Sequence, residues 1–159
     1  MDTQRTTQFT TSATFIKVEE SLGLIMGYAL VCETRDASGA LVPYFDLGEL
    51  QEDGSRIRDH ITPGAMLKAA AGFMESCRDA CEMHARDADG NVVKSGAVVF
   101  CWPMTQDIAK ALGIAVERTG LLVAVKPDNP EALAKARRGE YSGFSIGGSR
   151  VGSAEEFVE

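Results

Sequence analysis

One serine and one histidine of this chain are candidates for nucleophilic chemistry. Ser145 lies in the motif YSGFSIGG, which begins at Tyr141, and the chain has only two histidines, His60 and His84. A serine hydroxyl becomes nucleophilic only when a nearby base accepts its proton, and histidine is the side chain best suited to that role near neutral pH. A serine hydrolase is therefore one chemistry that these residue types could support.

The sequence around Ser145 is compatible with two different roles. Gly147 and Gly148 would let the main chain approach a substrate closely and direct N–H donors at a developing oxyanion. The same glycines would suit a tight turn or a β-bulge in which the serine has no chemical role. The spacing of Gly143, Ser145 and Gly147 matches G-x-S-x-G. However, no helix-forming sequence follows, so an α/β-hydrolase arrangement is excluded.

The two histidines differ in their sequence contexts. His84 lies at the end of a long predicted helix, just before a turn, a place from which a side chain can face a cleft. A histidine at a helix end is, however, more often structural. His60 lies in a loop just before a helix cap, where a solvated or capping role is expected. His84 is therefore the better candidate for a general base.

Four cysteines allow two further kinds of chemistry. Cys77, Cys81 and His84 fall at i, i+4 and i+7 of one predicted helix, so they share one face and could bind zinc, with Cys32 or Cys101 as a fourth ligand. Alternatively, Cys81 or Cys101 could pair with His84 as a cysteine nucleophile. The spacing C-x₃-C differs from the usual zinc knuckle, and Cys77 and Cys81 also continue the apolar stripe. We therefore predict reduced thiols buried in the core and no metal site.

The hydrophobic pattern predicts single helices among bent, glycine-marked strands. Residues 1–13 are polar and predict a mobile N-terminal arm, and residues 14–159 predict one domain without a linker or repeat. The predicted fold class is α+β, a compact bent β-barrel surrounded by helices. Strands are expected at 14–33, 92–102, 120–125 and 141–151, a loop at 46–59, and helices that begin at 62–63, 105 and 129–130.

Composition and charge exclude several classes of function. Of 159 residues, 45% are hydrophobic and 25% are charged, which is typical of a folded domain. The net charge of −7 and the scattered basic residues argue against nucleic acid as a partner. No apolar run approaches the roughly 20 residues that a membrane helix needs, and the N-terminus lacks the layout of a signal peptide.

Several short motifs follow one another along the chain. They are ESLGLIMGYA from Glu20, YFD from Tyr44, DHITPGAM from Asp59, Met83-His84, GAVVF from Gly96, TGLLV from Thr119 and GFSIGG from Gly143. In this order they resemble the motifs of the phage prohead proteases, in particular a subgroup of phage serine proteases from prophages of Gram-positive bacteria. The resemblance covers the chain from about Lys17 to Val151.

This resemblance implies a fold similar to the herpesvirus assemblin protease, usually active as a homodimer. It implies that Ser145 is the nucleophile and His84 the general base, and that no cofactor is needed. The implied substrates are the scaffolding protein and the N-terminal part of the major capsid protein. Cleavage would occur in the host cytoplasm, inside the prohead, before expansion and DNA packaging.

The third catalytic residue and the activity itself remain open at this point. In the family an acidic residue, or a histidine in the herpesvirus relatives, follows the nucleophile. The tail of this chain offers Glu155, Glu156 and Glu159, of which Glu156 and Glu159 fit about equally. A carboxylate there would orient the imidazole of the base. The alternative function is that of a catalytically inactive head or scaffold-associated protein with the same fold.

Overall fold

The fold is that of a computed structural model, which describes residues 8–9, 15–46, 52–55, 58–82, 85–141, 143–144 and 146–147. Within these residues the chain is α+β, as the sequence predicts. The strands are β1 (Gln8–Phe9), β2 (Phe15–Glu19), β3 (Leu24–Arg35), β4 (Leu41–Pro43), β5 (Asp79–Ala80), β6 (Gly96–Met104), β7 (Arg118–Pro127) and β8 (Ile146–Gly147), and the helices are α1 (Pro63–Ser76), α2 (Gln106–Leu112) and α3 (Pro130–Arg137).

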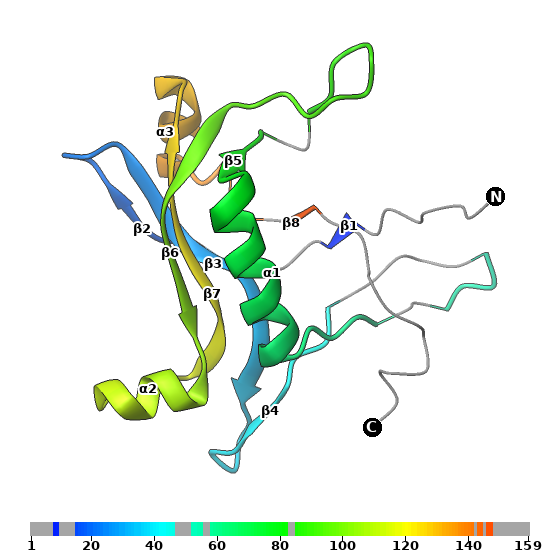
Figure 1. The fold of residues 1–159 in the computed structure, drawn as a ribbon, viewed down its shortest axis with the longest axis vertical. Helices are drawn as coiled ribbons and strands as arrows, with labels where there is room; N and C mark the ends of the chain where they lie inside the picture. The colour runs from blue at the N-terminus through cyan, green and yellow to red at the C-terminus, as the bar shows by residue number, and fades with distance from the viewer. Residues whose placement is uncertain are drawn as a thin grey trace.

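An antiparallel six-stranded sheet forms the centre of the molecule (Figure 1). Its order is β2-β3-β7-β6-β5, and β4 pairs with the far end of β3, beyond β2. Within the described residues, the outer strands β2 and β5 do not pair, so these strands form an open sheet. The closed barrel of the sequence analysis therefore remains a prediction.

The long strands bend at register shifts, which the glycine-marked strand sequences predict. The pairing of β3 with β7 shifts between Tyr28 and Leu30, and that of β6 with β7 shifts between Val98 and Phe100. Gly120 lies at a close approach of β7 to β3. Its φ is +154°, and an added Cβ would lie 2.2 Å from the carbonyl oxygen of Leu30. Only glycine fits this position without displacing the main chain.

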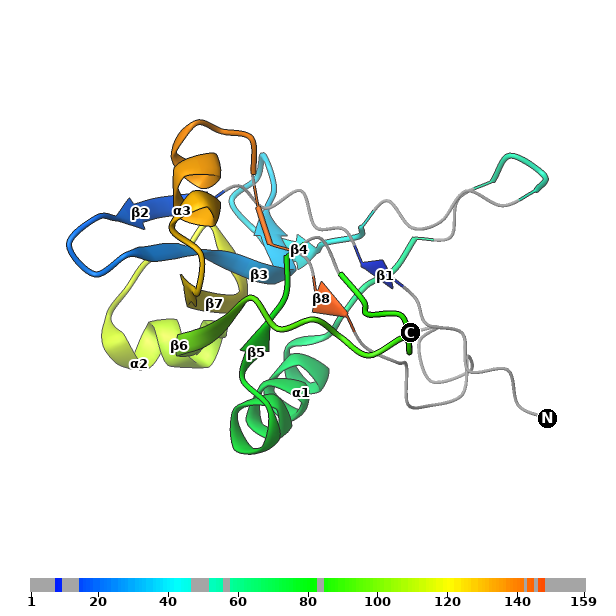
Figure 2. The same ribbon diagram turned by 90° about the horizontal axis from the view of Figure 1, so that it is seen from above.

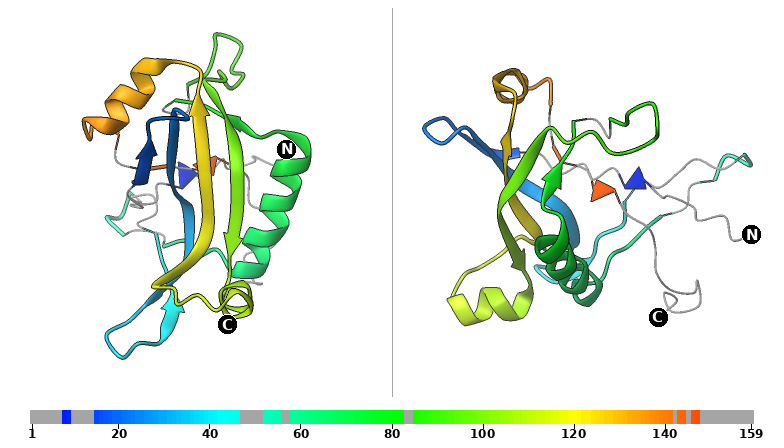
Figure 3. Two further views of the ribbon diagram at one scale, coloured as in Figure 1. Left: turned by 90° about the vertical axis from the view of Figure 1, so that its left-hand side faces the viewer. Right: turned by 45° about the horizontal axis from the view of Figure 1, so that its top comes forward.

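The helices cover the two faces of the sheet unequally. Helix α1 packs along one face, against β6 and β7, whereas α3 and α2 lie on the other side, near opposite ends of the sheet (Figures 1 and 3). The core lies between α1 and the sheet. It consists of the buried residues Ala29, Leu30, Cys32, Met66, Ala70, Val98, Leu121, Val123 and Val125.

Helix α1 begins where the sequence predicts and ends earlier. The Thr62 hydroxyl accepts a hydrogen bond from the N–H of Ala65, and Pro63 occupies the first turn. The predicted apolar stripe continues through Cys77, yet the helix ends at Ser76, and β5 follows to pair with the start of β6. The placement of His84 at the end of this helix is therefore wrong, because the helix ends eight residues before it.

Strand β1 lies within the stretch 1–13, for which the sequence analysis predicts a mobile arm. It pairs antiparallel with β8, so that Gln8 lies opposite Gly147 and Phe9 opposite Ile146. This two-stranded sheet is separate from the main sheet (Figure 2). The predicted strand 141–151 is described as a strand only at β8. Among the described residues, no helix is long and apolar enough to cross a membrane.

Candidate functional site

The residues of the predicted catalytic site lie outside the described part of the chain. These are Ser145, His84, Gly148, Glu156 and Glu159. Gly147, the other predicted oxyanion residue, lies in β8. The structure does describe Phe144 and Ile146 beside Ser145, and Glu82 and Ala85 near His84, and these neighbours define the candidate site.

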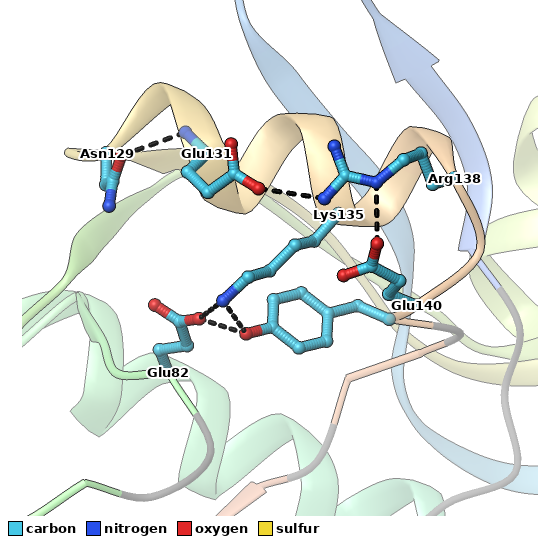
Figure 4. Close-up of polar contacts among 7 residues, drawn as sticks. Glu82, Asn129, Glu131, Lys135, Arg138 and Glu140 are labelled. Atoms are coloured by element: carbon cyan, nitrogen blue, oxygen red, sulfur yellow. Dashed lines mark hydrogen bonds and ion pairs between the residues drawn. The ribbon is translucent and has the colours of Figure 1, made fainter.

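A polar cluster joins the segment before His84 to the segment before Ser145 (Figure 4). The Tyr141 hydroxyl donates a hydrogen bond to Oε1 of Glu82. The Lys135 Nζ lies 3.0 Å from the same Oε1 and 3.1 Å from the Tyr141 oxygen. We call Glu82, Lys135 and Tyr141 the polar clamp. It connects residues that are up to 59 positions apart in the chain.

The clamp holds its charges in the ionised state. The hydrogen bond from Tyr141, and next the one from Lys135, keep the pKa of the Glu82 carboxyl below its ordinary value. The hydrogen bond of Lys135 to Tyr141, and next the one to Glu82, raise the pKa of the Lys135 ammonium. The Lys135 ammonium also lies 5.2 Å from the centre of the Tyr141 ring, within cation–π range. The carboxylate and the ammonium therefore both stay charged at neutral pH.

The other neighbours of the two predicted catalytic residues are also held in place. The N–H of Ala85 donates to the Glu82 carbonyl at 3.0 Å, and the Ala85 carbonyl accepts from Val93 at 2.9 Å. Phe144, directly before Ser145, packs against the hydrophobic core, and Ile146 after it pairs with β1. Each predicted catalytic residue therefore has fixed residues close to it on both sides in the sequence.

His60 has a structural environment. Its Nδ1 lies 3.0 Å from the carbonyl oxygen of Tyr44, and a carbonyl can only accept, so Nδ1 carries the proton. Its ring packs against Phe45, with the centres 5.4 Å apart. The imidazole is half-buried and tied to a loop. The role of His60 is therefore structural, but it is neither the solvated position nor the helix cap that the sequence predicts, because Thr62 caps α1.

The zinc alternative loses its geometric basis. It requires Cys77, Cys81 and His84 on one helix, whereas α1 ends at Ser76. Within the described residues there is no group of three or more His, Cys, Asp or Glu side chains that could hold a metal ion. The prediction of buried thiols is correct for Cys32 and wrong for Cys77, which is exposed because the chain leaves the helix there.

The polar clamp was not predicted from the sequence. Glu82 lies two residues before His84 and Tyr141 four residues before Ser145, but no spacing rule relates residues as far apart as Glu82 and Tyr141. In the sequence Lys135 is an ordinary basic residue in the last turn of α3, where the helix dipole favours a positive charge. Only the packing of α3 near the sheet brings the three side chains together.

The chain was compared with protein-family models, with curated proteins and with solved structures, and nothing matched significantly. The resemblance to the prohead proteases therefore rests on the motifs quoted from the sequence.

Proposed function

We propose that the chain is a serine endopeptidase of phage head assembly, with Ser145 as nucleophile and His84 as general base. The observation that supports this most directly is the hydrogen bond from Tyr141 to Glu82. One residue extends a chain by at most about 3.6 Å, so the two residues from Glu82 to His84 allow a reach of about 7 Å, and the four from Tyr141 to Ser145 a reach of about 14 Å. Contact between the two side chains is within this reach.

In the proposed reaction, His84 takes the proton of the Ser145 hydroxyl as Oγ bonds to the scissile carbonyl carbon. Main-chain N–H groups of Gly147 and Gly148 stabilise the oxyanion. His84 then gives its proton to the leaving amine, and water hydrolyses the acyl-enzyme to release a carboxylate and restore the serine. A carboxylate of Glu156 or Glu159 accepts from the imidazole N–H and fixes its tautomer.

The proposed substrates are the scaffolding protein and the N-terminal part of the major capsid protein, cleaved inside the prohead in the host cytoplasm. The proposed active form is a homodimer without a cofactor. The finer fold proposal is an assemblin-like bent barrel. The bulges in β3 and β6 support it, because bulges increase the local bend and twist of a sheet.

A second candidate function is a head or scaffold-binding protein without catalytic activity. One observation favours it: strand β6 exposes 60% of Phe100 and 50% of Trp102. The partners of these residues on β7 are Ala124 and Leu122, so both side chains lie on the sheet face opposite the core. Exposed aromatic side chains on neighbouring positions are typical of protein-binding surfaces.

A fluorophosphonate probe tests the proposed activity without knowledge of the cleavage site. The activated serine displaces fluoride and forms an Oγ–P bond, which mass spectrometry locates. We expect labelling at Ser145 that is lost in Ser145→Ala and reduced at least a hundredfold in His84→Gln. Ser142→Ala and His60→Gln serve as controls and should label like the wild type. An unlabelled wild type, or labelling independent of His84, would reject the proposal.

Incubation with the scaffolding protein separates the two candidate functions. The endopeptidase is expected to cleave the scaffold, and Ser145→Ala is expected to bind it without cleavage. If the wild type and Ser145→Ala both bind the scaffold and leave it intact under assembly conditions, the chain is a scaffold-binding protein without catalytic activity.

A further inference from the structure

The polar clamp draws together three parts of the chain. Lys135 comes from α3, Glu82 follows β5, and Tyr141 follows α3 and leads toward Ser145 (Figure 4). The side chains of Lys135 and Glu82 are 32% and 31% exposed, so water screens their ion pair only in part. Because Tyr141 contacts both charged groups, the three side chains form one closed set of contacts.

Helix α3, which carries Lys135, is held in place along its length. Its residues Ala132 and Ala136 are buried, and at its start the Asn129 side chain accepts a hydrogen bond from the N–H of Glu131. At its end, the N–H of Glu140 donates to the Lys135 carbonyl at 3.0 Å. Arg138 also forms ion pairs with Glu131 and Glu140, at 2.8 and 2.6 Å, as Figure 4 shows. Lys135 is therefore a fixed point against which the other two members are held.

From this geometry we infer that Glu82, Lys135 and Tyr141 are positioning residues that hold Ser145 within reach of His84. The inference rests on the proposed function. None of the three is assigned contact with substrate. Their role is to fix the distance between two segments that no strand pairing joins among the described residues. A misplacement of about 1 Å between reacting groups can cost about a hundredfold in rate.

The Tyr141 hydroxyl offers the smallest change that opens the clamp. Tyr141→Phe keeps the ring and removes the hydrogen bond to Glu82. Tyr28→Phe is a matched control, because the Tyr28 hydroxyl also makes a long-range hydrogen bond, to the carbonyl of Arg118. That contact joins β3 to β7 and involves neither segment of the proposed site. The two variants therefore remove the same chemical group in different places.

The test is the rate of labelling of Ser145 by the fluorophosphonate, resolved into probe affinity (KI) and maximal rate (kinact), at a temperature where each variant is folded. We expect Tyr141→Phe to lower kinact at least tenfold with KI within about twofold, and Tyr28→Phe to match the wild type. Lys135→Met should behave like Tyr141→Phe. The charge-swapped pair Glu82→Lys with Lys135→Glu should recover part of the rate that either single change loses.

The outcomes separate this inference from the proposed function. If Ser145 labels with His84 dependence, but Tyr141→Phe keeps the wild-type kinact, the clamp is merely structural and the inference is overturned while the endopeptidase stands. A rate loss in Tyr28→Phe equal to that in Tyr141→Phe would also overturn it, since the effect would then be general. If the wild type does not label, the proposed function fails and the inference fails with it.

Discussion

The Tyr141 hydroxyl donates a hydrogen bond to the Glu82 carboxylate across 59 positions of sequence. This contact connects the segment that leads to Ser145 with the segment that leads to His84. Lys135 completes the cluster from α3.

The close approach at Gly120 predicts a strong effect of one methyl group. In Gly120→Ala the Cβ would meet the Leu30 carbonyl oxygen at 2.2 Å, and the φ of +154° adds strain. We expect a loss in the free energy of unfolding on the order of 3 kcal/mol, measured by urea denaturation. Gly72→Ala in α1 is the control, because nothing lies within 4 Å of its Cβ. It should stabilise by about 0.5–1 kcal/mol. Equal effects would contradict the tight β3–β7 contact.

The packing of α1 on the sheet predicts unequal effects of two adjacent truncations. Met66 is fully buried in the core, whereas Leu67, the next residue, is 39% exposed. Met66→Ala should lower the free energy of unfolding by about 2–5 kcal/mol, because it leaves a cavity. Leu67→Ala should cost less than about 1 kcal/mol. A larger loss for Leu67 would mean that α1 presents a different face to the sheet.

The sequence predicts the strands and the helix starts better than the site. The strand expected at 92–102 begins at Gly96 as β6, and the strand expected at 120–125 appears as β7. The three helices begin where the sequence predicts, and there the side chains of Thr62, Thr105 and Asn129 accept main-chain hydrogen bonds. These features depend on residues close together in the sequence, which is why local patterns reveal them.

The end of α1 shows why part of the fold was missed. The helical stripe continues to Cys77 and Ala80, but the structure pairs Asp79 and Ala80 with Ala97 and Gly96 of β6. Main-chain hydrogen bonds to a strand far along the chain override the local helical pattern there. The polar clamp was missed for the same reason, because its three members meet only through tertiary packing.

The four cysteines should differ in reactivity toward a thiol reagent. Cys77 is exposed, whereas Cys32 is fully buried, and burial together with the nearby Glu33 raises the pKa of its thiol to about 12. We expect a disulfide reagent at pH 8 to modify Cys77 first and Cys32 only after unfolding, as located by mass spectrometry. Burial raises the pKa of Cys101 as well, so it should react more slowly than Cys77.

The same modification tests the cysteine-protease alternative. If Cys81 or Cys101 were the nucleophile with His84, alkylation would abolish cleavage and Ser145→Ala would not. We expect the reverse. Fast reaction of Cys32 in the folded protein would contradict the placement of β3 in the core.

The pH dependence of stability reports on the clamp directly. The hydrogen bonds from Tyr141 and Lys135 lower the pKa of Glu82 in the folded state below its ordinary value of 4.5. A lowered folded pKa adds stability that is fully present above 4.5 and is lost as the pH falls through the folded pKa. The wild type should therefore exceed Glu82→Gln in unfolding free energy by about 1 kcal/mol or less at pH 7, and the difference should vanish in acid.

The same comparison of Glu82 with Glu82→Gln, repeated in a protein that carries Tyr141→Phe, identifies the cause of this pH dependence. In Tyr141→Phe the largest contribution to the lowered pKa of Glu82 is removed. The difference in unfolding free energy between the proteins with glutamate and with glutamine at position 82 should then be smaller, and it should disappear at a higher pH than in the wild-type background. A difference that is the same at all pH values would show that Glu82 makes no such contacts in solution.

The separation between the Ser145 Oγ and the nearer ring nitrogen of His84 tests the central claim most directly. It is best measured in a crystal structure of the chain with Ser145 unmodified. We expect the two atoms to lie within hydrogen-bond reach, about 2.6–3.2 Å, or slightly farther without a ligand. A serine and a histidine on different faces of the domain would contradict the proposed catalytic pair.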